Sequence, residues 1–123
     1  MREVLKRHHI SFRNAMAGIV WSFRSQPNFR VHAVLALSAL TAGFLFQISA
    51  VETAVIVFTI LLGLTVEMIN TSIEAMTDLI TSEWHKDAKT AKDVSAGMML
   101  IVATGAVIVA LVIFGPRILA LFE

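Results

Sequence analysis

Three long apolar segments dominate the hydrophobic pattern of the chain. They run from about residue 31 to 50, from 51 to 80 and from 92 to 114. A helix needs about 20 residues to cross the hydrocarbon core of a bilayer, which is roughly 30 Å thick, so each segment predicts a transmembrane helix. The second is longer than the core is thick, and we expect its polar half to end in water. The third is predicted to stop at Gly115 and Pro116, a pair that breaks helices.

A different pattern precedes the first span, between about residues 4 and 25. Apolar side chains recur there at helical spacing along one stripe, with basic residues beside it. The stripe consists of Leu5, Phe12, Met16, Ile19, Val20 and Phe23. This pattern is typical of an amphipathic helix lying in the plane of the lipid head groups, and a core helix of a soluble bundle is the alternative. Gln26, Pro27 and Asn28 are predicted to break this helix and turn the chain into the membrane.

Composition supports a membrane protein of one domain, residues 1–123. Hydrophobic residues make up 57% of the chain and charged residues 15%, and the mean hydropathy is +0.78. A water-facing core of this size could not bury such long apolar runs. The net charge of +1 excludes a strongly basic nucleic-acid binder, and the absence of cysteine excludes disulfides and thiolate metal sites. We also expect no removable signal peptide, because no apolar stretch with a small-residue cleavage site begins the chain.

Basic residues predict the orientation in the membrane. Those before the first span are Arg2, Lys6, Arg7, Arg13, Arg24 and Arg30. Those between the second and third spans are Lys86, Lys89 and Lys92. Basic loops stay in the cytoplasm, so both regions are expected there, whereas residues 47–53 carry no Lys or Arg and should face outward.

Four polar side chains form a stripe on the second span. At about 100° per residue, Glu67, Asn70, Glu74 and Asp78 lie within about 80° of arc. A charge at mid-membrane costs at least ~2.5 kcal/mol, so these carboxylates need burial in protein, a cation or the cytoplasmic interface. The apolar helix before Glu67 spans about 24 Å, which places the stripe near the cytoplasmic edge of the core. Lipid and water-soluble substrates could meet there.

This stripe favours a hard cation. Mg²⁺ typically takes one or two carboxylates together with nucleotide phosphate oxygens, and a carboxylate free of metal could remove a proton. Lys92 and Asp93, at the start of the third span, would bring a cation to the same level. The alternatives are a proton or ion path and an oligomer interface. Neither of the glycine-rich nucleotide motifs occurs, so any ATP site must be built differently.

The histidines add little to this picture. His8 and His9 are interpreted as head-group contacts and His32 as a snorkelling residue at the membrane entrance. Only His85 is expected near the proposed site.

The residues Glu67-x-x-Asn70 and Glu74-x-x-x-Asp78, followed by residues 82–85 and 91–93, resemble the prokaryotic diacylglycerol kinase family over nearly the whole chain. The ending Pro116-Arg117-Ile118 is similar to the Gram-positive branch, which mostly phosphorylates undecaprenol. The resemblance implies a multi-pass homotrimer in the bacterial cell membrane, with three membrane helices per subunit, shared active sites, and the N-terminus and site in the cytoplasm. It also implies direct, Mg²⁺-dependent transfer of the ATP γ-phosphate to a lipid hydroxyl, with undecaprenol favoured over diacylglycerol.

By position, the resemblance also implies roles for single residues. Glu67 would be the general base, Asn70 would orient the phosphates and Lys92 would neutralise their charge. Glu74 would bind Mg²⁺, and Asp78 would have a structural role at the helix end. The implied nucleotide contacts are Gln26, Glu74, Glu83, His85, Lys92 and Asp93.

One position departs from the family pattern. The family commonly has a glutamate, a second acidic metal ligand, where this chain has Gln26. An amide can still offer a carbonyl oxygen, but it removes one negative charge and should weaken metal binding. The alternatives to an active kinase are therefore a small ion or proton transporter and a catalytically impaired scaffold of the same family.

Overall fold

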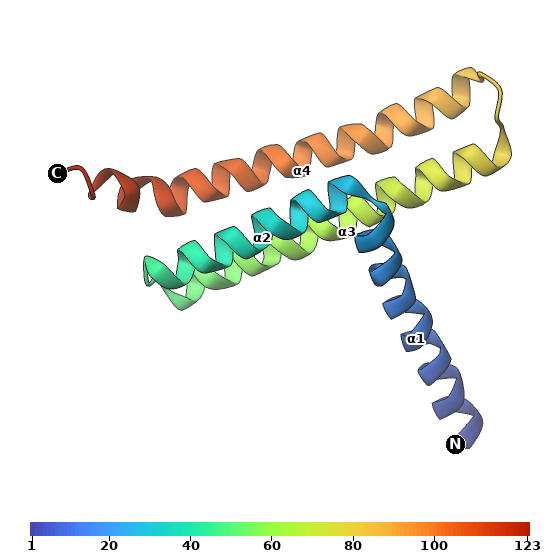
Figure 1. The fold of residues 1–123 in the computed structure, drawn as a ribbon, viewed down its shortest axis with the longest axis horizontal. Helices are drawn as coiled ribbons and strands as arrows, with labels where there is room; N and C mark the ends of the chain where they lie inside the picture. The colour runs from blue at the N-terminus through green and yellow to red at the C-terminus, as the bar shows by residue number, and fades with distance from the viewer.

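The chain folds into four helices joined by short connections (Figure 1). The computed structural model describes the backbone of residues 1–123 and the side chains of residue 1 and residues 8–123. The helices are α1 (Arg2–Ser25), α2 (Pro27–Leu45), α3 (Ala50–Ile80) and α4 (Lys86–Leu119). The backbone of residues 1–123 contains no strand, so the predicted all-α fold is confirmed.

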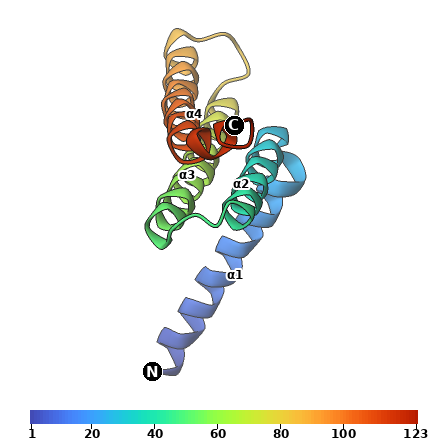
Figure 2. The same ribbon diagram turned by 90° about the vertical axis from the view of Figure 1, so that its left-hand side faces the viewer.

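Helices α2, α3 and α4 run side by side, and α1 leaves them at a steep angle (Figures 1 and 2). Each of these three helices is long and apolar enough to cross a membrane. Their large apolar side chains mostly face outward, as shown by Leu37, Phe58 and Leu111, which are each about two-thirds exposed. Lipid tails are as apolar as these side chains, so this exposure fits a bilayer. The three predicted spans are confirmed as candidate membrane helices.

A small apolar core lies near the α2–α3 connection. Ile56 of α3 packs there with Ile113 and Phe114 of α4, and all three side chains are buried. Phe46 packs against this cluster, with its ring centroid 6.1 Å from that of Phe114. The core therefore ties together the ends of the helices opposite the α3–α4 loop.

A capping box fixes the start of α3. The backbone N–H of Ser49 donates to the Glu52 carboxylate at 2.8 Å, and the N–H of Glu52 donates to the Ser49 hydroxyl at 3.3 Å. These bonds satisfy N–H groups that the first turn leaves without helical partners. The turn before them includes Gln47 with a φ of 50°. The first span consequently ends at Leu45, not near residue 50.

The prediction that the third span stops at Gly115 and Pro116 is wrong, because α4 continues through both residues to Leu119. A proline inside a helix removes one backbone hydrogen bond. Next to it, the guanidinium of Arg117 donates to the carbonyl oxygen of Ile113 at 2.6 Å and forms two bonds to the Glu52 carboxylate, at 2.9 and 3.0 Å. These bonds hold the last turns of α4 against α3.

The break between α1 and α2 is shorter than predicted. Only Gln26 is non-helical, with an extended backbone, and Pro27 occupies the first turn of α2. Proline suits that position because its fixed φ is already helical and no partner for its missing N–H is needed there. Of the predicted apolar stripe, Leu5 lies outside the residues with described side chains, and the members from Phe12 to Phe23 are exposed.

Candidate functional site

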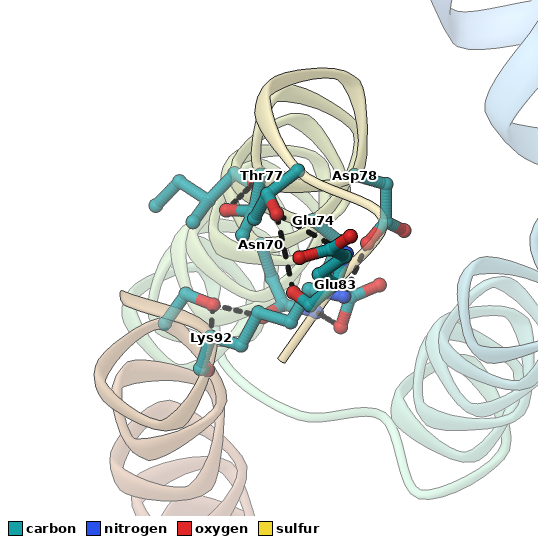
Figure 3. A network of polar contacts seen from close by, with 9 residues as sticks. Asn70, Glu74, Thr77, Asp78, Glu83 and Lys92 are labelled. Atoms are coloured by element: carbon teal, nitrogen blue, oxygen red, sulfur yellow. Dashed lines mark hydrogen bonds and ion pairs between the residues drawn. The ribbon is translucent and has the colours of Figure 1, made fainter. Parts of the chain in front are cut away.

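The polar stripe of α3 passes from a buried to an open environment. Glu67 is 2% exposed and Asn70 is 6% exposed, whereas Glu74 and Asp78 are both exposed. One helix face thus carries a carboxylate shielded from water and, about two and three turns later, two carboxylates that water can reach. The stripe predicted from periodicity lies on one helix, and Figure 3 shows its last three members near the start of α4.

Asn70 is held by residues from two helices. Its Nδ2 donates to Glu74 Oε1 at 3.1 Å, one turn further along α3. On its other side, the hydroxyl of Ser95 in α4 donates to Asn70 Oδ1 at 2.7 Å. The amide therefore links the two helices and directs its donor end toward the Glu74 carboxylate.

Lys92 of α4 crosses to α3. Its ammonium group lies 2.5 Å from Asp78 Oδ1, and Figure 3 shows the two side chains reaching toward each other. The resemblance implies a structural role for Asp78 at the helix end. In the structure, Asp78 holds the ammonium group of Lys92, the residue expected to neutralise phosphate charge. Asp93 pairs with Lys89 one turn away on α4. Both aspartates thus neutralise lysines beside the site.

A hollow lies between the end of α3, the connecting loop and the start of α4. Three of the predicted nucleotide contacts, Glu83, His85 and Lys92, line it together with Asp78 and Lys89. The other lining residues are Thr77, Thr81, Ser82, Trp84 and Ala88. Lys89 and Lys92 of α4 give the wall of this hollow two ammonium groups, which could contact a phosphate-bearing ligand.

Local hydrogen bonds shape this loop. The Thr81 hydroxyl donates to the carbonyl oxygen of Glu83 at 3.1 Å and lies 3.2 Å from the Glu83 N–H, which donates to it. His85 is the N-cap of α4, and its Nδ1 accepts from the N–H of Asp87 at 3.2 Å. Because His85 uses Nδ1 for the cap, its Nε2 is the nitrogen left for a ligand in the hollow.

His32 lies opposite Glu67, a neighbour that the sequence did not predict for it. Its Nε2 is 3.9 Å from Glu67 Oε2, and its side chain is 24% exposed. An apolar groove between α2, α3 and α4 reaches His32 at one end and is lined mainly by small and aliphatic side chains. The imidazole therefore stands between this groove and the buried carboxylate.

Gln26 has no described hydrogen bond to the site through its side chain, but the helix geometry places it at the same end of the molecule. It precedes His32 by ~9 Å along α2, and Glu74 follows Glu67 by ~10 Å along α3. The two helices are antiparallel (Figure 1), so we expect Gln26 and Glu74 to lie at similar heights beyond the His32–Glu67 pair.

The donor set fits a metal brought in with a nucleotide. Among residues with described side chains, no three of the types His, Cys, Asp and Glu form a group that could hold a metal by itself. Mg²⁺ seldom uses such cages, because it keeps waters and takes one or two carboxylates plus phosphate oxygens. The exposed Glu74 carboxylate, oriented by Asn70, is a donor of that kind.

Ser95 and His32 are the site residues that the sequence did not reveal. Ser95 lies one turn after Lys92 on α4 and is completely buried, at 0% exposure. Its spacing from Lys92 was the only available signal, because helical periodicity shows which residues share a face and not which helix that face meets.

A family model described as prokaryotic diacylglycerol kinase matches residues 13–114. The undecaprenol kinase of Bacillus subtilis is 39% identical over 118 residues, which cover 95% of each chain. The diacylglycerol kinase of Synechocystis is 38% identical over 113 residues, which cover 91% of this chain and 65% of that protein. The diacylglycerol kinase of Pseudomonas aeruginosa is 32% identical over 90 residues, 73% of each chain.

Proposed function

The chain belongs to the prokaryotic diacylglycerol kinase family and is a lipid kinase, and on that premise we propose that it transfers the γ-phosphate of ATP to the hydroxyl of undecaprenol with Mg²⁺. The observation that carries this proposal is the meeting of α3 and α4. Glu67 is a buried carboxylate on the same face of α3 as Asn70 and Glu74. Lys92 of α4 reaches this helix further along, at Asp78. The similarity to undecaprenol kinase along 95% of both chains supports that lipid, and diacylglycerol is the second candidate.

Glu67 acts as the general base in this proposal. Its carboxylate accepts the proton of the lipid hydroxyl while the hydroxyl oxygen attacks the γ-phosphorus, and the bond from that phosphorus to the bridging oxygen of ADP breaks. The products are the lipid phosphate and ADP, and the proton remains on Glu67 until it leaves to water. Burial of Glu67 keeps water away from the transferred group.

Lys92 and the hollow beside it bind the nucleotide. Phosphoryl transfer depends on positioning and on neutralising the phosphate oxygens more than on covalent catalysis. Lys92 supplies positive charge at the wall of the hollow, and Glu83 and His85 contact the rest of the nucleotide. Asp93 pairs with Lys89 and orients the Lys89 ammonium group beside the same site.

Glu74 would hold Mg²⁺, with Gln26 as a weaker oxygen donor. The ion would neutralise the charge of the nucleotide phosphates. Asn70 keeps the Glu74 carboxylate in one orientation and remains within reach of phosphate oxygens.

The lipid would approach from the bilayer. The groove between α2, α3 and α4 has mostly apolar walls and ends at His32, 3.9 Å from Glu67. A hydrocarbon chain in this groove would place its hydroxyl end toward the general base. We further propose that the protein is a homotrimer in the bacterial cell membrane, with α1 on the membrane surface and the N-terminus and active site in the cytoplasm.

The first experiment measures phosphate transfer from radiolabelled ATP and Mg²⁺ to undecaprenol and to diacylglycerol in parallel, with purified protein in detergent. Glu67→Gln should reduce transfer by at least 10²-fold, because the amide cannot accept the proton. Glu123→Gln, an exposed carboxylate at the C-terminus, is the matched control and should be fully active. Transfer to neither lipid would refute the kinase proposal, and ATP-independent ion flux would favour a transporter.

A further inference from the structure

Ser95 is a polar residue to which the proposed reaction gives no role. It is completely buried, at 0% exposure, although serine is usually exposed. Its hydroxyl lies 2.7 Å from Asn70 Oδ1 and 2.9 Å from the carbonyl oxygen of Lys92. Both partners are acceptors there, so the hydroxyl is the donor, and its shorter contact crosses from α4 to α3.

The direction of this bond matters because an asparagine amide has two ends of nearly equal shape and opposite function. With Oδ1 toward Ser95, Nδ2 faces Glu74 and donates to its carboxylate at 3.1 Å. With the amide reversed, a carbonyl oxygen would face the negatively charged carboxylate, so Glu74 selects the first orientation. The Ser95 hydroxyl completes this arrangement from α4, because it donates to Oδ1 and so holds the amide in place against Glu74.

We propose that Ser95 is a positioning residue for the cation–phosphate site: it fixes the Asn70 amide, which in turn fixes the Glu74 carboxylate in the orientation that receives a divalent cation. This inference rests on the proposed function of Glu74. It makes one hydrogen-bond chain, Ser95 to Asn70 to Glu74, responsible for coupling the α4 helix that carries Lys92 to the α3 helix that carries the metal ligand.

A purely structural role makes different predictions. If Ser95 only satisfied the carbonyl oxygen of Lys92, its loss would affect helix stability and leave cation binding unchanged. Ser38 provides the matched control, because its exposed hydroxyl donates to the carbonyl oxygen of Val34 in its own helix at 2.9 Å and, among the residues with described side chains, bonds to no other helix. Ser38→Ala therefore removes the same atom and only a local bond.

The test measures Mn²⁺ binding to purified protein by electron paramagnetic resonance, because Mn²⁺ prefers the same oxygen ligands as Mg²⁺. Ser95→Ala should weaken Mn²⁺ binding by about 3- to 10-fold, the effect of one hydrogen bond, and raise the Mg²⁺ concentration for half-maximal transfer by a similar factor with the KM for lipid unchanged. Ser95→Thr, which keeps the hydroxyl, should restore binding toward the wild-type value. Ser38→Ala should change neither quantity.

A double-mutant cycle identifies the route of the effect. In an Asn70→Ala background, Ser95→Ala should cause no further loss of Mn²⁺ binding, since the residue through which it acts is gone. Equal Mn²⁺ binding by Ser95→Ala and wild type would overturn the proposal, as would an undiminished effect in the Asn70→Ala background. A wild-type protein that binds Mn²⁺ but transfers no phosphate would refute only the proposed kinase reaction, and one that binds no Mn²⁺ would refute both.

Discussion

At the scale of single residues, Lys92 is held by Asp78 before any phosphate reaches it. Their ion pair spans two helices and lies at the wall of the nucleotide hollow. Such a surface pair is worth little by itself, because water screens it and two side chains must be ordered. A triphosphate with several negative charges can therefore displace Asp78 at small cost. Asp78 thus keeps the Lys92 ammonium group in position but does not bind it tightly enough to compete with the nucleotide.

Removing this cation should impair catalysis strongly. Lys92→Met keeps much of the side-chain volume but removes the charge, and we expect kcat/KM for ATP to fall by about 10²-fold or more, as for other groups that stabilise transition-state charge. Lys89→Met is the matched control. Lys89 lines the same hollow, but it pairs with Asp93 of its own helix, whereas Lys92 pairs with Asp78 of α3. Steady-state kinetics with varied ATP measures both variants. Equal losses for the two lysines would mean that only the total charge of the hollow matters.

Gln26 should limit the affinity for metal. Gln26→Glu restores a negative charge at the height of Glu74, so we expect the Mg²⁺ concentration for half-maximal transfer to fall and turnover at low Mg²⁺ to rise by about 2- to 10-fold. The measurement is phosphate transfer across a Mg²⁺ titration. Gln47→Glu makes the same chemical change at the opposite end of the bundle and should have no effect. No gain from Gln26→Glu would show that the missing charge does not weaken this site.

Sequence predicts the residues of one helix face better than contacts between helices. The stripe from Glu67 to Asp78 follows from periodicity alone, because all four residues lie on one face of α3. The pairing of Lys92 with Asp78, and of Ser95 with Asn70, depends on how α4 is rotated against α3. The spacing of side chains within one helix does not predict how that helix is rotated against its neighbour.

At the scale of elements, the long helices were predictable and their ends were less so. A segment that crosses a bilayer needs about 20 apolar residues, and this length criterion identifies all three candidate spans. The ends depend on local bonds: Ser49 and Glu52 cap α3, and Pro27 starts α2. The sequence Ser-x-x-Glu is a recognisable capping box, so the start of α3 could have been predicted from the sequence. The continuation of α4 beyond Pro116 could not have been predicted in this way, because the bonds of Arg117 there are made to Glu52, which is far away in sequence.

The Arg117–Glu52 pair should therefore stabilise the end of the bundle opposite the site. Arg117→Gln removes two bonds to Glu52 and weakens the bond to the Ile113 carbonyl, so we expect the last turns of α4 to fray and Tm to fall by a few degrees. Thermal unfolding in detergent measures this change. Glu52 and Glu67 are ~22 Å apart along α3, so phosphate transfer at low temperature should be retained.

An exposed arginine on α1 provides the control for this substitution. Arg13→Gln removes the same charge from a residue that has no described ion pair and should leave Tm unchanged. A loss of transfer activity in Arg117→Gln without a change in Tm would contradict a purely stabilising role.

At the scale of the whole molecule, charge separates the two ends of the bundle. The end with the α3–α4 loop carries Lys86, Lys89 and Lys92, and the α1–α2 junction with Arg24 and Arg30 lies toward the same end (Figure 1). The connection between α2 and α3, residues 46–49, carries no Lys or Arg. The proposed reaction requires the first end to face the cytoplasm, where ATP is found, and the positive-inside rule predicts the same orientation.

The absence of cysteine allows a direct test of this orientation, because a single introduced cysteine is then a unique label site. We expect Gln47→Cys to react with a membrane-impermeant maleimide in intact cells, and Ser82→Cys to react only after the membrane is opened. Both residues are exposed in connections between helices, so each should accept a small thiol without loss of the fold. Labelling of Ser82→Cys in intact cells would place the hollow outside the cell, away from ATP, and would be incompatible with an ATP-dependent lipid kinase in this orientation.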